Sequence, residues 1–279
     1  WNWVGLKGSD VSLPNLFRKA GYQTIHVGKA HFAPKDREGE NPLNLGFDVN
    51  VAGTCFGAPG SYYGTRGFGV GSKNLHARPV PHLEKYHGQN IFLTEALTLE
   101  AKAEIDKALN ASKPFFLHMS HYAVHSPFQS DPRFAKNYQG KSPSLMAYAT
   151  MIEGMDKSLG DLMDHIKTKG VAENTLIIFL GDNGGDAPDK DLDGISSCAP
   201  LRGRKGAKWE GGIRVPFIAS WGKMNPGNAF QKDNPIVPNS MRQEFGTCFD
   251  LLPTLCKVAQ IKIPKSHKMD GQELGNLFA

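Results

Sequence analysis

The chain has 279 residues, of which 40% are hydrophobic and 21% are charged, as is ordinary for a globular protein with a sizeable core. No apolar run reaches the roughly 18 residues that a membrane-spanning helix needs. The formal net charge of +5 has no long basic run behind it, so it suits an anionic substrate but gives no case for nucleic acid. We expect a single α/β domain over residues 1–279.

The first elements that the sequence predicts are a short helix and a strand. Apolar residues recur at helical spacing from Leu13 to Ala20, and Ser12 suits the N-cap position. Residues 22–27 are then typical of a strand, which ends at Gly28-Lys29-Ala30-His31. If the chain stays extended there, the side chains of Lys29 and His31 point the same way.

The middle of the chain alternates long helices with strands. Residues 53–88 are rich in Gly, Tyr, Pro and His without a clean period, which predicts a long loop excursion over the face that carries the site. Helical periodicity marks residues 90–109 and, for the longest helix, residues 143–169. Residues 114–120 between them predict a strand.

A further strand is expected at residues 176–181, an almost wholly apolar run bounded by turn formers. Such a run predicts a strand buried on both faces, as in a parallel sheet. It ends abruptly in Asp182-Asn183-Gly184-Gly185, and open α/β sheets bind ligands just outside the carboxyl ends of their strands. The two oxygen donors suit Ca²⁺ or Mg²⁺, whereas an ordinary Asx turn that closes the strand is the alternative reading.

Three motifs accompany this strand end. Gly28-Lys29-Ala30-His31 and Ala123-Val124-His125-Ser126-Pro127 lie upstream, and Leu201-Arg202-Gly203-Arg204-Lys205-Gly206 lies downstream. In this order and spacing they resemble the sulfatase family of the alkaline-phosphatase superfamily, and the resemblance runs from Leu13 to about Leu274.

The resemblance implies an α/β sandwich of the alkaline-phosphatase type, with a mixed, mostly parallel central sheet flanked by helices. It implies a metal-dependent sulfuric ester hydrolase that acts on a small-molecule or carbohydrate sulfate ester, with a periplasmic or extracellular location. The metal would be Ca²⁺, or Mg²⁺ in its place, and Asp182 and Asn183 would be two of its ligands. The remaining roles that the resemblance implies are sulfate contacts for Lys29 and Lys205, support of the nucleophile for His31 and the leaving-group side for His125.

Some parts of the family pattern are not found in this sequence. Sulfatases use a formylglycine nucleophile made from Cys or Ser within C/S-x-P-x-R, after a strand that ends in Asp-Asp, and neither precedes Trp1. Cys198-Ala199-Pro200-Leu201-Arg202 fits the bare pattern, but it runs straight into the lysine motif, where Arg202 already has a place. The chain thus resembles the middle of a sulfatase, for which we expect no turnover on its own and an uncovered sheet edge.

Three other readings are weighed beside this one. A phosphodiester or phosphonate monoester hydrolase on the same scaffold would need similar cations and donors. A non-catalytic protein could keep the fold for binding alone. His118, His121 and His125 have a helical zinc-ligand spacing, but the residues before them are β-like, which speaks against a zinc site.

Overall fold

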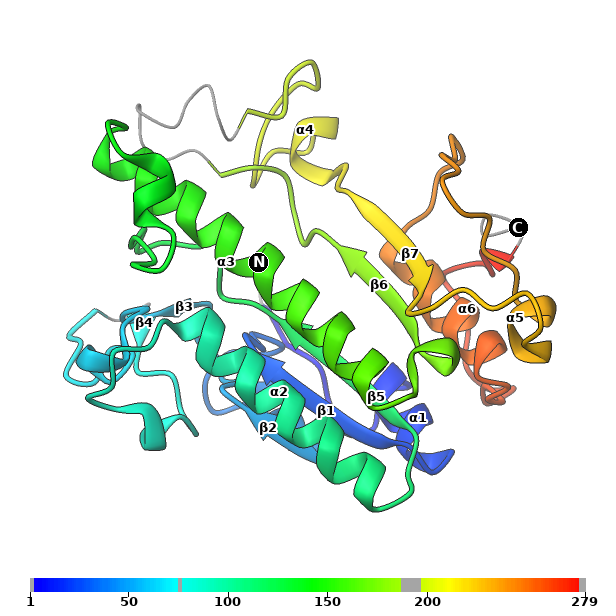
Figure 1. The fold of residues 1–279 in the computed structure, drawn as a ribbon. Coiled ribbons are helices and arrows are strands. Elements are labelled where there is room, and N and C mark those ends of the chain that lie inside the picture. The colour runs from blue at the N-terminus through cyan, green and yellow to red at the C-terminus, as the bar shows by residue number, and fades with distance from the viewer. Residues whose placement is uncertain (1–2, 75–76, 187–196, 276–279) are drawn as a thin grey trace.

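The computed structural model describes residues 3–74, 77–186 and 197–275 (Figure 1). Its helices are α1 (Leu13–Lys19), α2 (Leu93–Asn110), α3 (Pro143–Thr168), α4 (Glu210–Ile213), α5 (Ala229–Asp233) and α6 (Leu251–Val258). Its strands are β1 (Gln23–Gly28), β2 (Val49–Val51), β3 (Ala58–Pro59), β4 (Ala77–Arg78), β5 (Phe115–Ser120), β6 (Leu176–Leu180) and β7 (Phe217–Trp221). Over these ranges, none of the helices combines the length and apolarity needed to cross a bilayer.

The strands form a mixed, mostly parallel set. A three-stranded parallel sheet has the order β2-β1-β5, β3 and β4 form a parallel pair, and β6 and β7 form an antiparallel pair. The expected α/β class is therefore confirmed. The expected N-cap of α1 is also present, because the Ser12 hydroxyl accepts a hydrogen bond from the Asn15 backbone N–H at 3.4 Å.

The prediction that the strand at residues 176–181 is buried on both faces of a parallel sheet was wrong. Among the described strands β6 pairs with β7 alone, in antiparallel register, and Leu180 is 40% exposed. A short apolar run gives no information about which strand it will pair with. In the part of the chain that the structure describes, the second edges of β5 and β6 have no strand partner.

The main core lies between the three-stranded sheet and the two long helices. Figure 1 shows α2 and α3 side by side across one face of this sheet. Alternate residues of β1 point toward them, so that Ile25 and Val27 are fully buried against the apolar face of α2. The partly buried Leu117 and Met119 of β5 join the same cluster. This packing fixes the sheet that positions the ends of β1 and β5.

The excursion at residues 53–88 differs from the surface loop that the sequence predicted. It contributes Tyr62, Phe68, Val80 and Leu83 to the main core, each with an exposed fraction of 2% or less. Short 3₁₀ turns and the β3–β4 pair supply its regular backbone hydrogen bonds. Irregular backbone can pack this way because each large side chain fills a gap separately, and no periodic pattern reveals it.

The other face of the sheet carries a buried histidine pair. His26 of β1 and His118 of β5 stand opposite each other in register, and their Nδ1 atoms are 3.0 Å apart. His26 Nε2 donates to the Gly28 carbonyl at 3.1 Å, so His26 Nδ1 is the acceptor and His118 Nδ1 the donor. Phe32 and Phe47 surround the two rings. Burial lowers the pKa of His26 to about 3 and that of His118 to about 4.

This pair predicts a stability that falls with acidification. Below the ordinary histidine pKa of 6.5 the unfolded chain binds protons that the folded pair does not, so unfolding becomes easier as pH drops toward 4. In the double variant His26→Phe/His118→Phe, the slope of unfolding free energy against pH near pH 5 should decrease by about 2 to 3 kcal/mol per pH unit. Urea unfolding at a series of pH values measures this slope, and an unchanged slope would contradict the assignment.

Candidate active site

Lys29 is placed at the carboxyl end of β1 by a close backbone contact. Gly28 has φ 107°, and a Cβ on it would lie 1.8 Å from the Ser120 carbonyl oxygen, so only glycine fits there. The Lys29 backbone N–H donates to the same Ser120 oxygen at 2.7 Å. Burial lowers the pKa of Lys29; the Asp182 carboxylate opposes this effect and the Lys205 ammonium adds to it. Lys29 thus lies near Asp182 and Lys205, which come much later in the sequence.

His31 lies beside Lys29, although the chain is not extended there as expected. Its φ is 54°, and its backbone N–H donates to the Thr54 carbonyl at 2.9 Å. A Cβ at Gly57 would lie 2.9 Å from the imidazole, so the excursion packs directly on the ring. Burial is the main cause that lowers the pKa of His31, and Lys29 and His125 lower it further.

His125 sits in the loop that follows β5. Its Nδ1–H donates to the Ser126 carbonyl at 2.9 Å, which leaves Nε2 with its lone pair when the ring is neutral. Burial lowers the pKa of His125 most, and Lys205 and Lys29 lower it further. The Ser126 hydrogen bond and the Asp186 carboxylate act in the opposite direction. The ring is therefore held neutral by two nearby cations as well as by burial.

Asp182 and Asn183 follow β6 as the sequence predicts. Gly184 donates its N–H to the Gly212 carbonyl at 3.0 Å, and a Cβ on it would meet the Gly211 oxygen at 1.8 Å. Asn183 Nδ2 donates to the Gly184 carbonyl at 2.9 Å. This bond uses the amide nitrogen, so the Asn183 Oδ1 lone pairs can bind a ligand. The carboxylate and this amide oxygen are donors of the type that a hard cation prefers.

These donors make an incomplete metal site. Over residues 3–74, 77–186 and 197–275, no three His, Cys, Asp or Glu side chains lie close enough to hold a metal ion. Ca²⁺ takes about six to eight oxygen ligands. The chemistry of Asp182 and Asn183 thus fits a hard cation, and most of its ligands would have to come from other groups.

Lys205 is held next to the same strand end by an aspartate that sequence reasoning missed. Its backbone N–H donates to the Gly185 carbonyl at 3.1 Å, and its ammonium contacts Asp186 Oδ2 at 3.1 Å. The one sequence signal for Asp186 is its place at the end of the Asp-Asn-Gly-Gly-Asp run. Cys198 lies close by, with its sulfur accepting from the Gly185 N–H at 3.1 Å.

The structure brings the candidate residues to one place. Lys29 lowers the pKa of both His31 and His125, and His125 lowers that of His31. Lys205 acts on both Lys29 and His125, and Asp182 acts on Lys29, with Asn183 next to it in the chain. Two ammonium groups and two imidazoles, flanked by carboxylates, form a region that is suited to bind an anion and exchange a proton with it.

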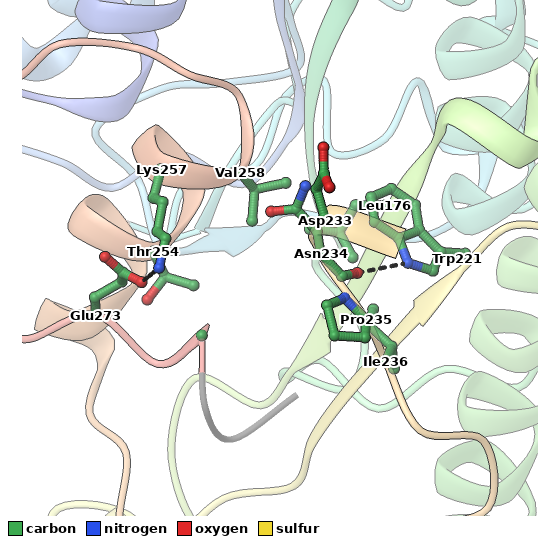
Figure 2. Close-up of a pocket in the computed structure, with 11 residues that line it drawn as sticks. Leu176, Trp221, Asp233, Asn234, Pro235, Ile236, Thr254, Lys257, Val258 and Glu273 are labelled. Atoms are coloured by element: carbon green, nitrogen blue, oxygen red, sulfur yellow. Dashed lines mark hydrogen bonds and ion pairs between the residues drawn. The ribbon is translucent and has the colours of Figure 1, made fainter. Parts of the chain in front are cut away.

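A cavity of about 180 Å³ lies at the other end of β6 and is separate from this group (Figure 2). It is lined by Leu176 at the start of β6, Trp221 at the end of β7 and Asp233, among others. Its lysine, Lys257, is already paired with Glu273. In the sequence, Asp189, Asp191, Asp193 and Gly194 match the start of an EF-hand loop but Pro200 stands where its glutamate is needed, and residues 189–194 lie outside the described residues.

Comparisons with known proteins give the family to which the sequence is similar. The sequence profile described as Sulfatase matches residues 2–261. The chain is 28% identical to a sulfatase of Formosa agariphila, covering 98% of the chain and 54% of that protein. It is 30% identical to arylsulfatase J of Mus musculus, covering 95% of the chain and 41% of that protein. The chain thus spans about half the length of these relatives.

Solved structures show the same fold. The crystal structure of Ps i-CgsB in complex with k-i-k-neocarrahexaose has a TM-score of 0.77 and 26% identity, covering 100% of this chain and 59% of that one. A putative sulfatase, yidJ of Bacteroides fragilis, has a TM-score of 0.66 at 17% identity, covering 98% and 60%. This confirms the expected alkaline-phosphatase-like fold class.

Substituting each lysine separately tests the convergence of the site. Lys29→Met should raise the pKa of both His31 and His125, because Lys29 lowers each of them. Lys205→Met should raise the pKa of His125 and leave that of His31 nearly unchanged, because Lys205 acts on His125 and is not among the groups that shift His31. NMR titration of the histidine side chains measures both values. Two variants with the same effect on both rings would show that the site is assembled differently.

Proposed function

Because the chain belongs to the sulfatase family, we propose that the protein hydrolyses a sulfate ester. The observation that supports this most is the gathering of Lys29, Lys205, His31 and His125 at the carboxyl ends of β1, β5 and β6. A sulfate group carries negative charge on several oxygens and gains charge on its leaving oxygen as the ester bond breaks. Cations and proton donors that are already in place stabilise this charge.

The two lysines would bind the sulfate group. The close contact of Gly28 with the Ser120 carbonyl fixes the backbone next to Lys29. The Asp186 carboxylate orients the Lys205 ammonium. Asp186 keeps the Lys205 ammonium from turning into solvent, and a sulfate oxygen can still approach the remaining N–H groups, since an ammonium has three donors. Both lysines therefore approach the sulfate from elements that are separate in the sequence.

His125 would donate the proton that the leaving oxygen needs. In the free site Lys205 and Lys29 favour its neutral form, which cannot donate from Nε2. A bound sulfate offsets both positive charges, so the pKa of His125 rises when substrate is present and Nε2 gains a proton. His31, next to Lys29, would support the nucleophile.

The metal and the nucleophile complete the proposal. Asp182 and Asn183 would supply two ligands to Ca²⁺ or Mg²⁺, and a bound cation would add positive charge next to the sulfate oxygens. The family nucleophile is a formylglycine. Cys198 is the one residue in C-x-P-x-R context in the sequence, but its sulfur is engaged by the Gly185 N–H, and Arg202 lies over the Trp209 ring at 4.0 Å. We therefore assign the nucleophile to a residue other than Cys198.

The substrate that we propose is a sulfated carbohydrate, in a periplasmic or extracellular location. One relative at 27% identity is an N-acetylgalactosamine-6-sulfatase of Mus musculus, and the Ps i-CgsB structure holds a neocarrahexaose. These are properties of those proteins, and they support the carbohydrate class rather than a particular sugar.

We expect the product of the complete reading frame that encodes this chain to release 4-nitrophenol from 4-nitrophenyl sulfate, and the 279-residue chain alone to show no turnover. Lys205→Ala in the product of the complete reading frame should reduce kcat/KM by about 100-fold, as the loss of one donor to a developing charge typically does. Bis(4-nitrophenyl) phosphate, assayed in parallel, separates the phosphodiesterase alternative. Preference for that substrate would overturn the sulfatase assignment.

If the 279-residue chain itself turns over the sulfate ester, the Cys198→Ala variant decides why. Loss of activity in that variant would identify Cys198 as the nucleophile and contradict our assignment.

Calorimetry tests the metal proposal. Ca²⁺ should bind to the complete protein, and Asp182→Ala should weaken binding by at least about 10-fold because it removes a charged oxygen ligand. Asp233→Ala, at the other end of the β6–β7 pair, is the matched control and should bind Ca²⁺ like the parent. Equal affinity in all three proteins would exclude Asp182 as a ligand.

A further inference from the structure

Tyr62, in the excursion, holds the loop that carries His125. Its side chain is fully buried, and its hydroxyl lies 2.7 Å from the Tyr122 carbonyl oxygen and 2.9 Å from the His125 carbonyl oxygen. Burial raises the pKa of Tyr62 well above its usual value, so the hydroxyl keeps its proton for donation. The Tyr62 hydroxyl therefore contacts both ends of the turn that runs from Tyr122 to His125.

Gln129 fixes the same loop from its other side. Its Oε1 accepts from the Tyr62 backbone N–H at 2.6 Å and from the Ser61 hydroxyl at 3.1 Å. The Tyr62 carbonyl in turn accepts from the Leu93 N–H at the start of α2, at 2.8 Å. Residues on both sides of His125 are thus anchored to Tyr62, which is itself anchored to a long helix.

We propose that Tyr62 is a positioning residue that sets the orientation of the His125 imidazole toward the sulfate group. That the bound group is a sulfate rests on the proposed function. The contact that orients His125 is present in the chain whatever the substrate is. The Tyr62 hydroxyl contacts backbone carbonyl oxygens of the His125 loop, and Gln129 contacts the Tyr62 backbone N–H, so Tyr62 acts on the ring through the loop backbone.

The backbone contact matters because the His125 ring is oriented by its own neighbour. His125 Nδ1–H donates to the Ser126 carbonyl, the next carbonyl along from the one that Tyr62 binds. If the Tyr62 contact is lost, the turn keeps its own hydrogen bond from the His125 N–H to the Tyr122 carbonyl at 3.0 Å, but the His125 carbonyl loses its anchor. The Ser126 carbonyl, one residue on, is then no longer fixed beside Nδ1, and the ring loses its set orientation.

The test compares two tyrosines that differ in what they hold. Tyr62→Phe removes the hydroxyl and keeps the ring that stacks on Phe92, with centroids 5.3 Å apart. Tyr63→Phe is the matched control, because the Tyr63 hydroxyl donates to the Ser130 carbonyl at 2.8 Å, farther along the same loop, and its ring also contacts Phe92. Both variants of the 279-residue chain are examined by ¹⁵N NMR of the histidine side chains, without substrate.

In Tyr62→Phe we expect the His125 ring to shift from the Nδ1–H tautomer toward a mixture, and its pKa to rise as solvent reaches it. In Tyr63→Phe both properties should match the parent. Parent-like His125 signals in Tyr62→Phe, or equal changes in the two variants, would overturn the proposal. If Tyr62→Phe does not fold, Gln129→Met tests the other side of the clamp with the same expected shift.

The same variants in the complete protein separate the two proposals. A His125 shift together with a reduced kcat at little-changed KM supports both. A His125 shift in a protein that cleaves no sulfate ester keeps Tyr62 as the positioning residue and refutes the proposed function. An unchanged His125 in an active sulfatase refutes the positioning role and leaves the function standing.

Discussion

The parallel pairing of β1 with β5 is the constraint on which the candidate site depends. It sets His26 opposite His118 and Gly28 opposite Ser120, so both strands end at the same edge. At that edge the Ser120 carbonyl lies where a side chain on Gly28 would be, and the Lys29 N–H closes on the same oxygen. Any bulkier residue at Gly28 would separate the strand ends, and Lys29 would move away from His125. The buried histidine hydrogen bond holds the same register from below the edge.

The electrostatics of the site follow from placing like charges together. Lys205 disfavours the charged states of Lys29 and His125, Lys29 disfavours that of His125, and burial acts in the same direction. Asp182 and Asp186 offset part of this cost from the β6 side. With both histidine rings of the site neutral, Asp182 and Asp186 balance the two ammonium groups in formal charge, and the remaining ammonium N–H groups are the donors that a bound anion can use. Affinity for an anionic group and control of the His125 proton are therefore two consequences of one arrangement.

Sequence patterns predicted the parts of this arrangement that are local. The glycines near Lys29 and Lys205, and the Asp182-Asn183 pair that follows an apolar run, are each short contiguous patterns, and helical or apolar periodicity located the main helices and strands. The pairing of β6 with β7 was not predictable, because hydrogen-bond partners leave no trace in a short apolar run. Tyr62 and Asp186 were missed for a related reason: each acts on a residue that is distant in sequence, through contacts that only the folded chain creates.

The site also joins two sheets that share no backbone hydrogen bonds in the described chain. Lys29 and His125 belong to the β1–β5 side, whereas Lys205 and Asp182 belong to the β6–β7 side. A small apolar cluster around Ile105, Ile166 and Ala172 lies between the two sides. It packs against Phe115 and Leu117 of β5 and against Ile177 of β6. Side-chain packing tolerates small shifts that a hydrogen-bonded ladder would resist, so this cluster lets the two sides adjust relative to each other. We therefore expect residues far from the site to influence how the two lysine-bearing sides are placed.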